Sequence, residues 1–181
     1  MRGAARSVGR SVVHGVTRGR QRSRRWLEAQ TRDVRDADVL EIGSGREVDG
    51  AYPYSFSSLF DESCRVTMSD VVPEHGHRVL DVSAMGIDEE FDVVLCASVL
   101  EHVPEAPAAA REIHRALRPG GVALVTVPLM YPLHDEPGDF WRFTEHGLRH
   151  LFRDFEDLRI ERIGARVAPF TYLMRAVKAP S

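Results

Sequence analysis

The chain has 181 residues, a formal net charge of −3, 43% hydrophobic residues and 28% charged residues. These values are ordinary for one soluble globular domain, and they exclude a solenoid, a collagen-like chain and a disulfide-stapled mini-protein. A chain of this length buries roughly 70% of its unfolded surface, which suffices for a core without cross-links. Its two cysteines, Cys64 and Cys96, fit a reducing compartment, so we expect a cytoplasmic protein.

The arginines are concentrated near the N-terminus. Residues 1–25 contain eight arginines and no acid, so this segment carries +8 and the remaining 156 residues carry −11. A solvated, partly helical extension, weak contact with an anionic membrane surface and a targeting peptide all fit such a segment, whereas the absence of interleaved aromatic residues before Trp26 argues against nucleic acid. We therefore expect a basic extension over residues 1–36, partly helical or disordered, ahead of a domain over residues 37–181. The basic segment is expected to contribute nothing to a ligand site in that domain.

From residue 38 onward, short apolar runs alternate with helical or loop segments. This alternation is typical of an α/β protein with a mostly parallel sheet flanked by helices, in which strands are buried on both faces. The predicted strands cover residues 39–42, 66–68, 78–80, 91–96 and 122–127.

One helix is predicted between the last two of these strands. Ala109, Ile113, Ala116 and Leu117 form an apolar stripe at helical spacing, and Pro107 is suited to the first turn. The stripe predicts a helix that lies against the sheet.

Turn and strand signals continue beyond this helix. The Arg-Pro-Gly-Gly sequence at 118–121 should end the helix in a type II turn. A second helix, capped by Thr144, is expected over 144–152, and residues 158–163 alternate like a half-exposed edge strand. Residues 172–174 look more helical than strand-like, so we expect the sheet to be abbreviated at its C-terminal edge, or to end in a strand too irregular to recognise.

A glycine-containing turn follows the first predicted strand. Glu41, Gly43 and Gly45 stand where open α/β sheets place their ligands, and glycine lets the backbone approach a ligand closely. A dinucleotide site would have a third glycine at position 48, where this chain has Val48, and an anionic pyrophosphate gains nothing from the Glu41 carboxylate. A ligand that carries a sulfonium and an ammonium group would gain from it. The structural alternative is a tight turn in which Glu41 caps a helix.

Four further motifs follow in order along the predicted strands. Ser69-Asp70 comes after the second strand and Asp81-Val82 after the third, residues 91–103 read FDVVLCASVLEHV, and LRPGG at 117–121 leads into the fifth strand. Together with the glycine turn, these motifs resemble those of the class I S-adenosylmethionine-dependent methyltransferases, which have a Rossmann-like fold. The similarity covers about residues 37–165.

The resemblance implies S-adenosylmethionine as the cofactor. It assigns Glu41 to the charged tail of the cofactor, Asp70 to the ribose hydroxyls and Asp81 to the adenine amino group. The cofactor-binding residues that it implies are Glu41, Gly43, Ser44, Gly45, Asp70, Asp81, Val82, Ala97 and Ser98.

Two departures from the family pattern affect this expectation. Glu47 stands where the family often has a third glycine, so the motif leaves open how the loop reaches the cofactor's carboxylate. The segment from Asp70 to Asp81 is too short for a crossover helix, and Pro73 and Gly76 indicate a loop there.

Candidate acceptor residues follow the fourth and fifth strands. A sulfonium donor is already activated, so the protein mainly has to hold the reacting atoms in line, and a hydroxyl acceptor would be assisted by a histidine base. His102, His134 and Asp139 are the predicted catalytic residues, the histidines as bases and Asp139 as a ligand of the acceptor hydroxyl. In the alternative interpretation His102 only caps a helix or packs against the cofactor, and Asp139 pairs with Arg142.

The string PGDFWRFT at 137–144 resembles a loop of bacterial methyltransferases associated with surface-glycan and other small-molecule biosynthesis. The leading hypothesis is therefore methyl transfer to a small-molecule or glycan-like acceptor at oxygen. The alternative is a binding module without turnover, attached to a membrane-associated biosynthetic complex. No metal site is expected, because His75 and His77 have no cysteine or carboxylate cluster at ligand spacing.

Overall fold

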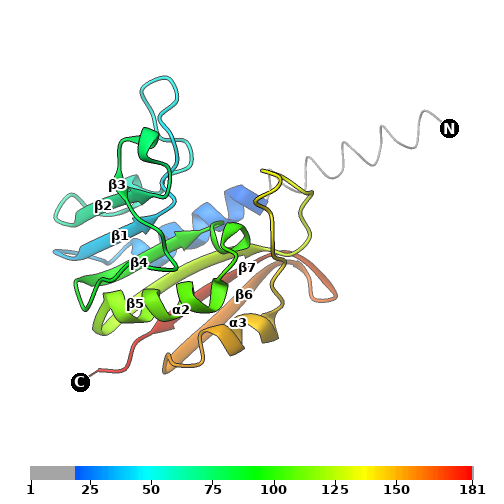
Figure 1. Ribbon diagram of the computed structural model, residues 1–181. Coiled ribbons are helices and arrows are strands. Elements are labelled where there is room, and N and C mark those ends of the chain that lie inside the picture. Colours follow the sequence, from blue (N-terminus) through cyan, green and yellow to red (C-terminus); the bar gives the residue numbers. More distant parts are fainter. Residues whose placement is uncertain (1–18, 181) are drawn as a thin grey trace.

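A computed structural model describes residues 19–180 of the chain (Figure 1). Within these residues the chain forms a seven-stranded sheet of order β3-β2-β1-β4-β5-β7-β6. The strands are β1 (Asp38–Ile42), β2 (Arg65–Asp70), β3 (Arg78–Val79), β4 (Phe91–Ala97), β5 (Leu117–Pro128), β6 (Asp157–Ala165) and β7 (Ala168–Val177). The named helices are α2 (Ala106–Ala116) and α3 (Glu145–Leu151), with short 3-10 turns η1 (Ser57–Leu59), η2 (Pro73–His75) and η3 (Leu100–His102), and residues 19–31 are also helical.

The first five strands are parallel, and their order reverses beside β1. This strand pairs with β2 on one side and with β4 on the other, β3 pairs with β2, and β5 pairs with β4. The carboxyl ends of all five strands therefore meet at one edge of the sheet, with the switch in strand order at its middle. Open α/β sheets bind their ligands at such a point.

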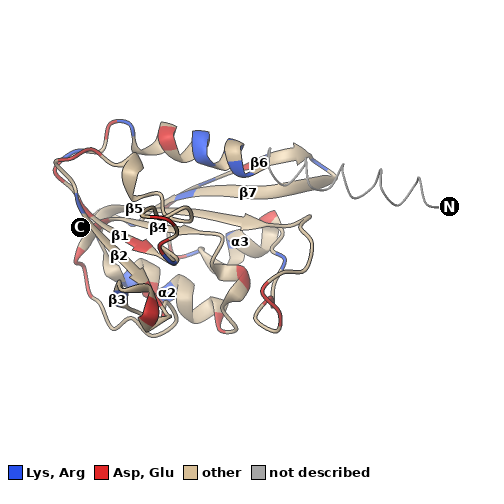
Figure 2. Cartoon of the chain, turned by 90° about the horizontal axis from the view of Figure 1, so that it is seen from above, with Lys and Arg blue, Asp and Glu red and all other residues tan. Residues whose placement is uncertain are grey.

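Helices cover both faces of the sheet. The helix over 19–31 lies on one face, and α2 and α3 lie on the other (Figure 2). On the first face Leu27 is fully buried and belongs to a core cluster with Val39, Val93 and Leu95. Residues 19–31 belong to the N-terminal extension expected from the sequence, but in the structure their helix packs into the core of the domain.

Both predicted helices on the opposite face are confirmed. In α2, Ala109, Ile113 and Ala116 are fully buried, and Pro107 lies in the first turn. Helix α3 begins after Thr144, whose side chain accepts a hydrogen bond from Gly147 N at 3.1 Å and so satisfies a free donor of the first turn.

The α/β fold class is confirmed, but the expected abbreviation at the C-terminal edge is wrong. The ten-residue strand β7 lies between β5 and β6 and is antiparallel to both. Residues 172–174, which look helical in the sequence, are buried on both faces of the sheet, and this burial removes the polar alternation that marks a strand. The strand fits into the short C-terminal segment because Ala165 pairs with Ala168, so only two residues form the connection.

Substitution of Met174 tests the position of β7 in the core. Met174 is fully buried, so Met174→Ala should lower the free energy of unfolding by about 2–5 kcal/mol. Val167→Ala, at the exposed tip of the same hairpin, is the matched apolar control and should leave that free energy nearly unchanged. Urea unfolding followed by circular dichroism measures both, and equal effects of the two changes would contradict the placement of β7.

Candidate cofactor and acceptor site

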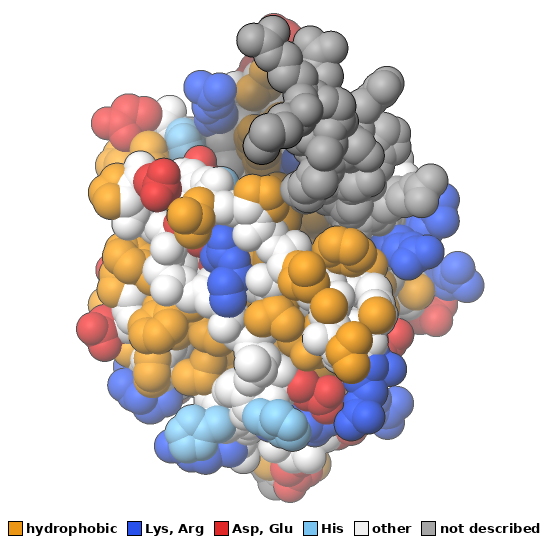
Figure 3. Space-filling view, turned by 90° about the vertical axis from the view of Figure 1, so that its right-hand side faces the viewer, with side chains coloured by type: hydrophobic (Ala, Val, Ile, Leu, Met, Phe, Trp, Pro, Cys, Tyr) orange, Lys and Arg blue, Asp and Glu red, His pale blue; other side chains and the backbone are white. Residues whose placement is uncertain are grey.

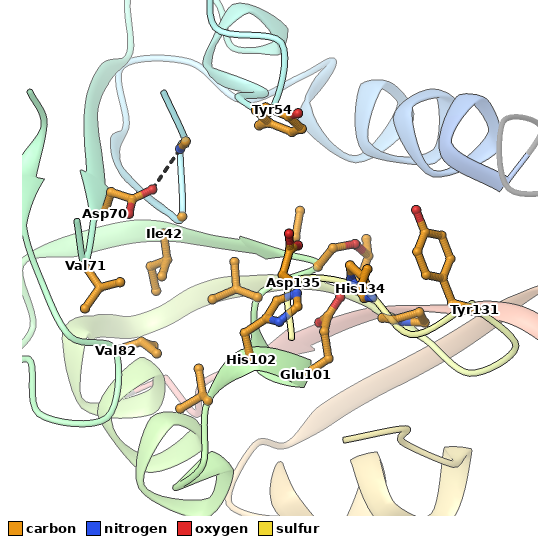
Figure 4. Close-up of a pocket in the computed structure, with 18 of the residues that line it drawn as sticks. Ile42, Tyr54, Asp70, Val71, Val82, Glu101, His102, Tyr131, His134 and Asp135 are labelled. Carbon is orange, nitrogen blue, oxygen red and sulfur yellow. Dashed lines mark hydrogen bonds between the residues drawn. The ribbon is translucent and has the colours of Figure 1, made fainter. Parts of the chain in front are cut away.

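A cavity of about 810 Å³ opens at the carboxyl ends of the parallel strands. Its walls come from the ends of β1, β2, β4 and β5, from the loops that follow them, and from the start of the helix over 19–31. Seven of the nine predicted cofactor-binding residues line it, while Glu41 and Ser44 do not. Figure 4 shows Asp70 and Val82 on one side of this cavity, with Glu101, His102 and His134 on the other.

The loop after β1 approaches its neighbours too closely for side chains at its glycines. Gly43 and Gly45 have φ values of +73° and +72°, a region that L-residues rarely adopt. A Cβ atom at Gly43 would lie 2.5 Å from Val99 Cγ2, and one at Gly45 would lie 2.9 Å from Tyr54 Cβ. The two glycines thus form a cradle at the cavity wall that any larger residue would fill.

Glu41 lies behind this loop and does not face the cavity. Its side chain is buried and accepts hydrogen bonds from Ser44 Oγ at 3.1 Å, Ser55 Oγ at 2.6 Å and Phe56 N at 2.5 Å. Ser44 is itself fully buried. The carboxylate of Glu41 therefore holds the loop, and a direct contact of Glu41 or Ser44 with a cofactor stays a prediction.

Asp70 ends β2 and lines the cavity. Its Oδ2 atom accepts from Gly45 N at 2.9 Å, and its Oδ1 atom accepts from Val72 N at 3.0 Å. Burial alone would raise the pKa of Asp70, but these N–H groups and His75, whose Nδ1 lies 3.1 Å from Oδ2, hold the pKa below its usual value. Asp70 is thus a charged acceptor at the cavity wall and also fixes the glycine loop.

The remaining predicted cofactor residues lie along the same wall. Asp81 is exposed, and its Oδ1 atom accepts from Ser83 N and Ser83 Oγ at 2.8 and 2.7 Å. Val82 is buried and lines the cavity, and Ala97 ends β4. Ser98 has a φ of +55°, and such a strained residue at the end of a strand is frequent at ligand sites.

Two histidines face each other at the other end of the cavity. The rings of His102 and His134 have centroids 4.8 Å apart and are nearly perpendicular. His102 Nδ1 lies 2.8 Å from Gly138 O, while His134 Nδ1 lies 3.2 Å from both Pro132 O and Asp139 Oδ2. Because the carbonyl and carboxylate oxygens can only accept, each Nδ1 donates and each Nε2 is left as an acceptor or ligand.

Glu101, beside His102 in η3, was not singled out in the sequence analysis. It is fully buried, and neither carboxylate oxygen has a hydrogen-bond partner among residues 19–180. Burial raises the pKa of its carboxyl to about 8. Its backbone carbonyl accepts from Phe140 N at 2.8 Å and from Trp141 N at 3.1 Å, so the loop after β5 is fixed directly over this residue.

Asp139 does not line the cavity. Its carboxylate forms a two-point ion pair with Arg142 at 2.6 and 2.8 Å and accepts from His134 N at 3.1 Å. The Arg142 guanidinium holds the pKa of Asp139 well below its usual range. The geometry matches the alternative in which Asp139 pairs with Arg142. Of the neighbouring aromatic residues, Phe143 is buried and Trp141 is 43% exposed. A contact of Asp139 with an acceptor hydroxyl stays a prediction, and the ion pair with Arg142 occupies both carboxylate oxygens.

The helix over 19–31 lines the cavity. This corrects the expectation that the basic N-terminal segment would contribute nothing to a ligand site. Gly19, Arg20 and Ser23 line the cavity. Arg20 Nη2 donates to Pro53 O at 2.9 Å, and its guanidinium lies 5.2 Å from the ring centroid of Tyr54. The membrane and targeting alternatives concern residues 1–25, of which residues 1–18 lie outside the described residues. Between residues 19 and 180 no helix combines the length and the apolar character needed to cross a bilayer.

The loop after β5 keeps large apolar side chains in contact with solvent. Figure 3 looks onto the end of the molecule that carries this loop, and hydrophobic side chains gather there. The exposed hydrophobic residues of this loop are Met130, Tyr131, Leu133, Phe140 and Trp141. Two of them, Met130 and Tyr131, also line the cavity.

Comparison with known proteins identifies the family. Residues 17–162 match the methyltransferase domain family, so the chain belongs to the S-adenosylmethionine-dependent methyltransferases, and S-adenosylmethionine is the cofactor of this fold. Among curated proteins, the ubiquinone biosynthesis O-methyltransferase of Xanthomonas oryzae pv. oryzae is 33% identical over 106 residues, which are 49% of this chain and 42% of the relative. An uncharacterized methyltransferase of Mycobacteroides abscessus is 29% identical over 56% of this chain and 43% of the relative. The match thus spans less than half the length of these relatives.

Solved structures share the fold over most of the chain. The 1,6-didemethyltoxoflavin-N1-methyltransferase of Burkholderia thailandensis, solved with its substrate and S-adenosylhomocysteine, has a TM-score of 0.60 at 28% identity and covers 87% of this chain and 78% of its own. A putative methyltransferase from Bacillus halodurans C-125 has a TM-score of 0.64 at 13% identity over 86% of this chain and 98% of its own.

Substitution of Gly43 tests the close approach of the loop to Val99. Gly43→Ala should destabilise the fold and weaken binding of S-adenosylhomocysteine, because the new Cβ overlaps Val99 Cγ2. Gly50→Ala is the matched control: its φ is also positive, at +77°, but nothing lies within 4 Å, so only the backbone cost of about 1–2 kcal/mol should remain.

The double variant Gly43→Ala/Val99→Ala removes the overlapping methyl group. It should recover part of the loss in both the unfolding free energy and the calorimetric affinity. Equal behaviour of Gly43→Ala and Gly50→Ala, with no recovery in the double variant, would contradict a steric role for this approach.

Proposed function

We propose that the chain transfers a methyl group from S-adenosylmethionine to a small-molecule or glycan-like acceptor, with oxygen as the methylated atom. The observation that carries this proposal is that one cavity has two ends with different chemical groups. One end offers carboxylates at the ends of β2 and β3 and a glycine cradle, and the other end offers two imidazoles with free Nε2 atoms. The first set suits a nucleoside, and the second suits an acceptor that must lose a proton.

The cofactor end fits the family's cofactor. Asp70 would accept hydrogen bonds from the ribose hydroxyls, because its carboxylate is charged and lies at the wall of the cavity. Asp81 would face the adenine amino group, while Gly43 and Gly45 would let the backbone approach the amino acid tail closely. Glu41 would act by holding this loop. Bound S-adenosylmethionine supplies an activated methyl group, so the protein needs no nucleophile of its own.

The acceptor end is lined by apolar and aromatic side chains beside the two histidines. Val103, Met130, Tyr131 and Phe170 are among its wall residues, and they suit a flat ring or the apolar face of a sugar. Two similar proteins support a small acceptor: one is an O-methyltransferase of ubiquinone biosynthesis, and the other is a 1,6-didemethyltoxoflavin-N1-methyltransferase.

His102 and His134 would activate the acceptor oxygen. Gly138 O fixes the tautomer of His102, so its Nε2 can accept the proton of a hydroxyl group as the bond to carbon forms. Asp139 would act through His134: it contacts the ring nitrogen and the backbone N–H of this residue and is itself fixed by Arg142. In this arrangement Asp139 is a positioning residue.

The ribose contact of Asp70 can be tested with a modified ligand. Asp70→Ala should weaken S-adenosylhomocysteine binding about 10–100-fold, as expected for loss of a hydrogen bond to a charged group. Asp70 also fixes Gly45, so the deciding comparison is with 2′-deoxy-S-adenosylhomocysteine in isothermal titration calorimetry. The wild type should bind the deoxy analogue more weakly than the parent compound, whereas the variant should bind both equally. An undiminished preference for the 2′-hydroxyl in the variant would refute the contact.

Turnover can be tested by titration with S-adenosylmethionine, followed by an acceptor screen. Binding together with formation of S-adenosylhomocysteine in the presence of phenolic or sugar hydroxyl acceptors is the expected result. Absence of cofactor binding would overturn the proposal. Tight binding without product from any acceptor class would favour a binding module without turnover.

A further inference from the structure

The acceptor end of the cavity brings together three side chains that can ligate a metal ion. Glu101, His102 and His134 each place one donor atom so that the three atoms lie within 4.8 Å of one another. We propose that these residues bind a divalent transition-metal ion of the Zn²⁺ class at the wall of the acceptor pocket. This inference rests on the proposed function for the identity of the pocket, and it departs from the sequence-based expectation of no metal.

The carboxylate of Glu101 is the strongest argument for a cation. The side chain is fully buried, lines the cavity and has no hydrogen-bond partner among residues 19–180. The charges of Arg142 and Asp139 both act on Glu101, but Arg142 is paired with both oxygens of Asp139, so this pair brings no net positive charge to Glu101. An isolated buried carboxylate is costly, and a bound cation would satisfy both its charge and its lone pairs.

The two histidines are oriented as metal ligands usually are. Each donates its Nδ1–H to an oxygen, His102 to Gly138 O and His134 to Pro132 O or Asp139 Oδ2, which makes Nε2 the nitrogen that can ligate a metal. Ligating histidines in metalloproteins have such partners on the opposite ring nitrogen, because the partner fixes the tautomer and the ring direction. Arg142 donates to Asp139 Oδ2 and so fixes the carboxylate that orients the His134 ring.

The ligand set indicates the class of metal and what it can do. Two imidazoles and one carboxylate suit Zn²⁺ and its first-row neighbours better than Mg²⁺ or Ca²⁺, which prefer oxygen ligands. Three protein ligands leave a coordination position open, as in catalytic zinc sites. An acceptor hydroxyl bound at that position would lose its proton to solvent more readily as a metal-bound oxygen. His102 and His134 would then act through the ion and not as free bases.

Metal binding can be measured without an acceptor. We expect the full-length chain, freed of metal with a chelator, to bind one Zn²⁺ in isothermal titration calorimetry. Glu101→Gln, His102→Ala and His134→Ala should each weaken this binding at least about 100-fold, since even loss of a supporting partner costs about 10–100-fold. Circular dichroism and binding of S-adenosylhomocysteine without metal show whether each variant is folded. They also separate failure of this inference from failure of the proposed function.

An exposed histidine pair provides the matched control. His146 and His150 stand four residues apart on α3, a spacing that can chelate metal adventitiously, and both are exposed. The double variant His146→Ala/His150→Ala should retain the Zn²⁺ site in the cavity. Loss of binding in this variant alone, or no binding by the wild type, would overturn the proposal.

A spectroscopic probe covers the case in which a ligand variant fails to fold. Co²⁺ added to the wild type and to His146→Ala/His150→Ala should give the same visible absorption bands of a four- or five-coordinate site, and Zn²⁺ should abolish them. A spectrum of six-coordinate aqueous Co²⁺ in both proteins would also overturn the proposal.

Discussion

The hydrogen bond between the Asp70 carboxylate and the backbone N–H of Gly45 joins two loops on which the site depends. It connects the end of β2 to the turn after β1, and the other carboxylate oxygen fixes Val72. Glu41 supports the same turn from behind, through Ser44, Ser55 and Phe56. Two buried carboxylates thus hold the turn that carries Gly43 and Gly45 at the wall of the cavity.

The sheet topology determines which residues line the cavity and at which edge of the sheet the cavity opens. Parallel pairing brings the ends of β1, β2, β4 and β5 to one edge, so groups far apart in sequence face a common space. The cofactor end uses backbone conformation and carboxylates. The acceptor end uses η3 and the loop after β5, which hydrogen bonds to the Glu101 carbonyl fix against each other. In the proposed function, these two chemically different ends are the physical basis for transfer between two ligands.

Local signals predicted much of this arrangement from sequence. The apolar runs that gave β1 and β4, the stripe on α2 and the Thr144 cap are short-range patterns, and the structure confirms them. Strand β7 was not predicted because burial on both faces removed the alternation of polar and apolar residues. Glu101 was not predicted as a site residue because its burial depends on the loop after β5. His134 is distant from Glu101 in the sequence, and only the tertiary fold brings the two together. For the same reason, the sequence could not decide whether Asp139 faces an acceptor or Arg142.

We propose that the two ends of the cavity hold the cofactor and the acceptor in a fixed order. A crystal structure of the chain with S-adenosylhomocysteine would reveal this order. We expect the ribose hydroxyls to lie within hydrogen-bond distance of Asp70 and the sulfur to point toward the end formed by Glu101, His102 and His134. A ligand bound in the reverse direction, or outside this cavity, would refute this arrangement.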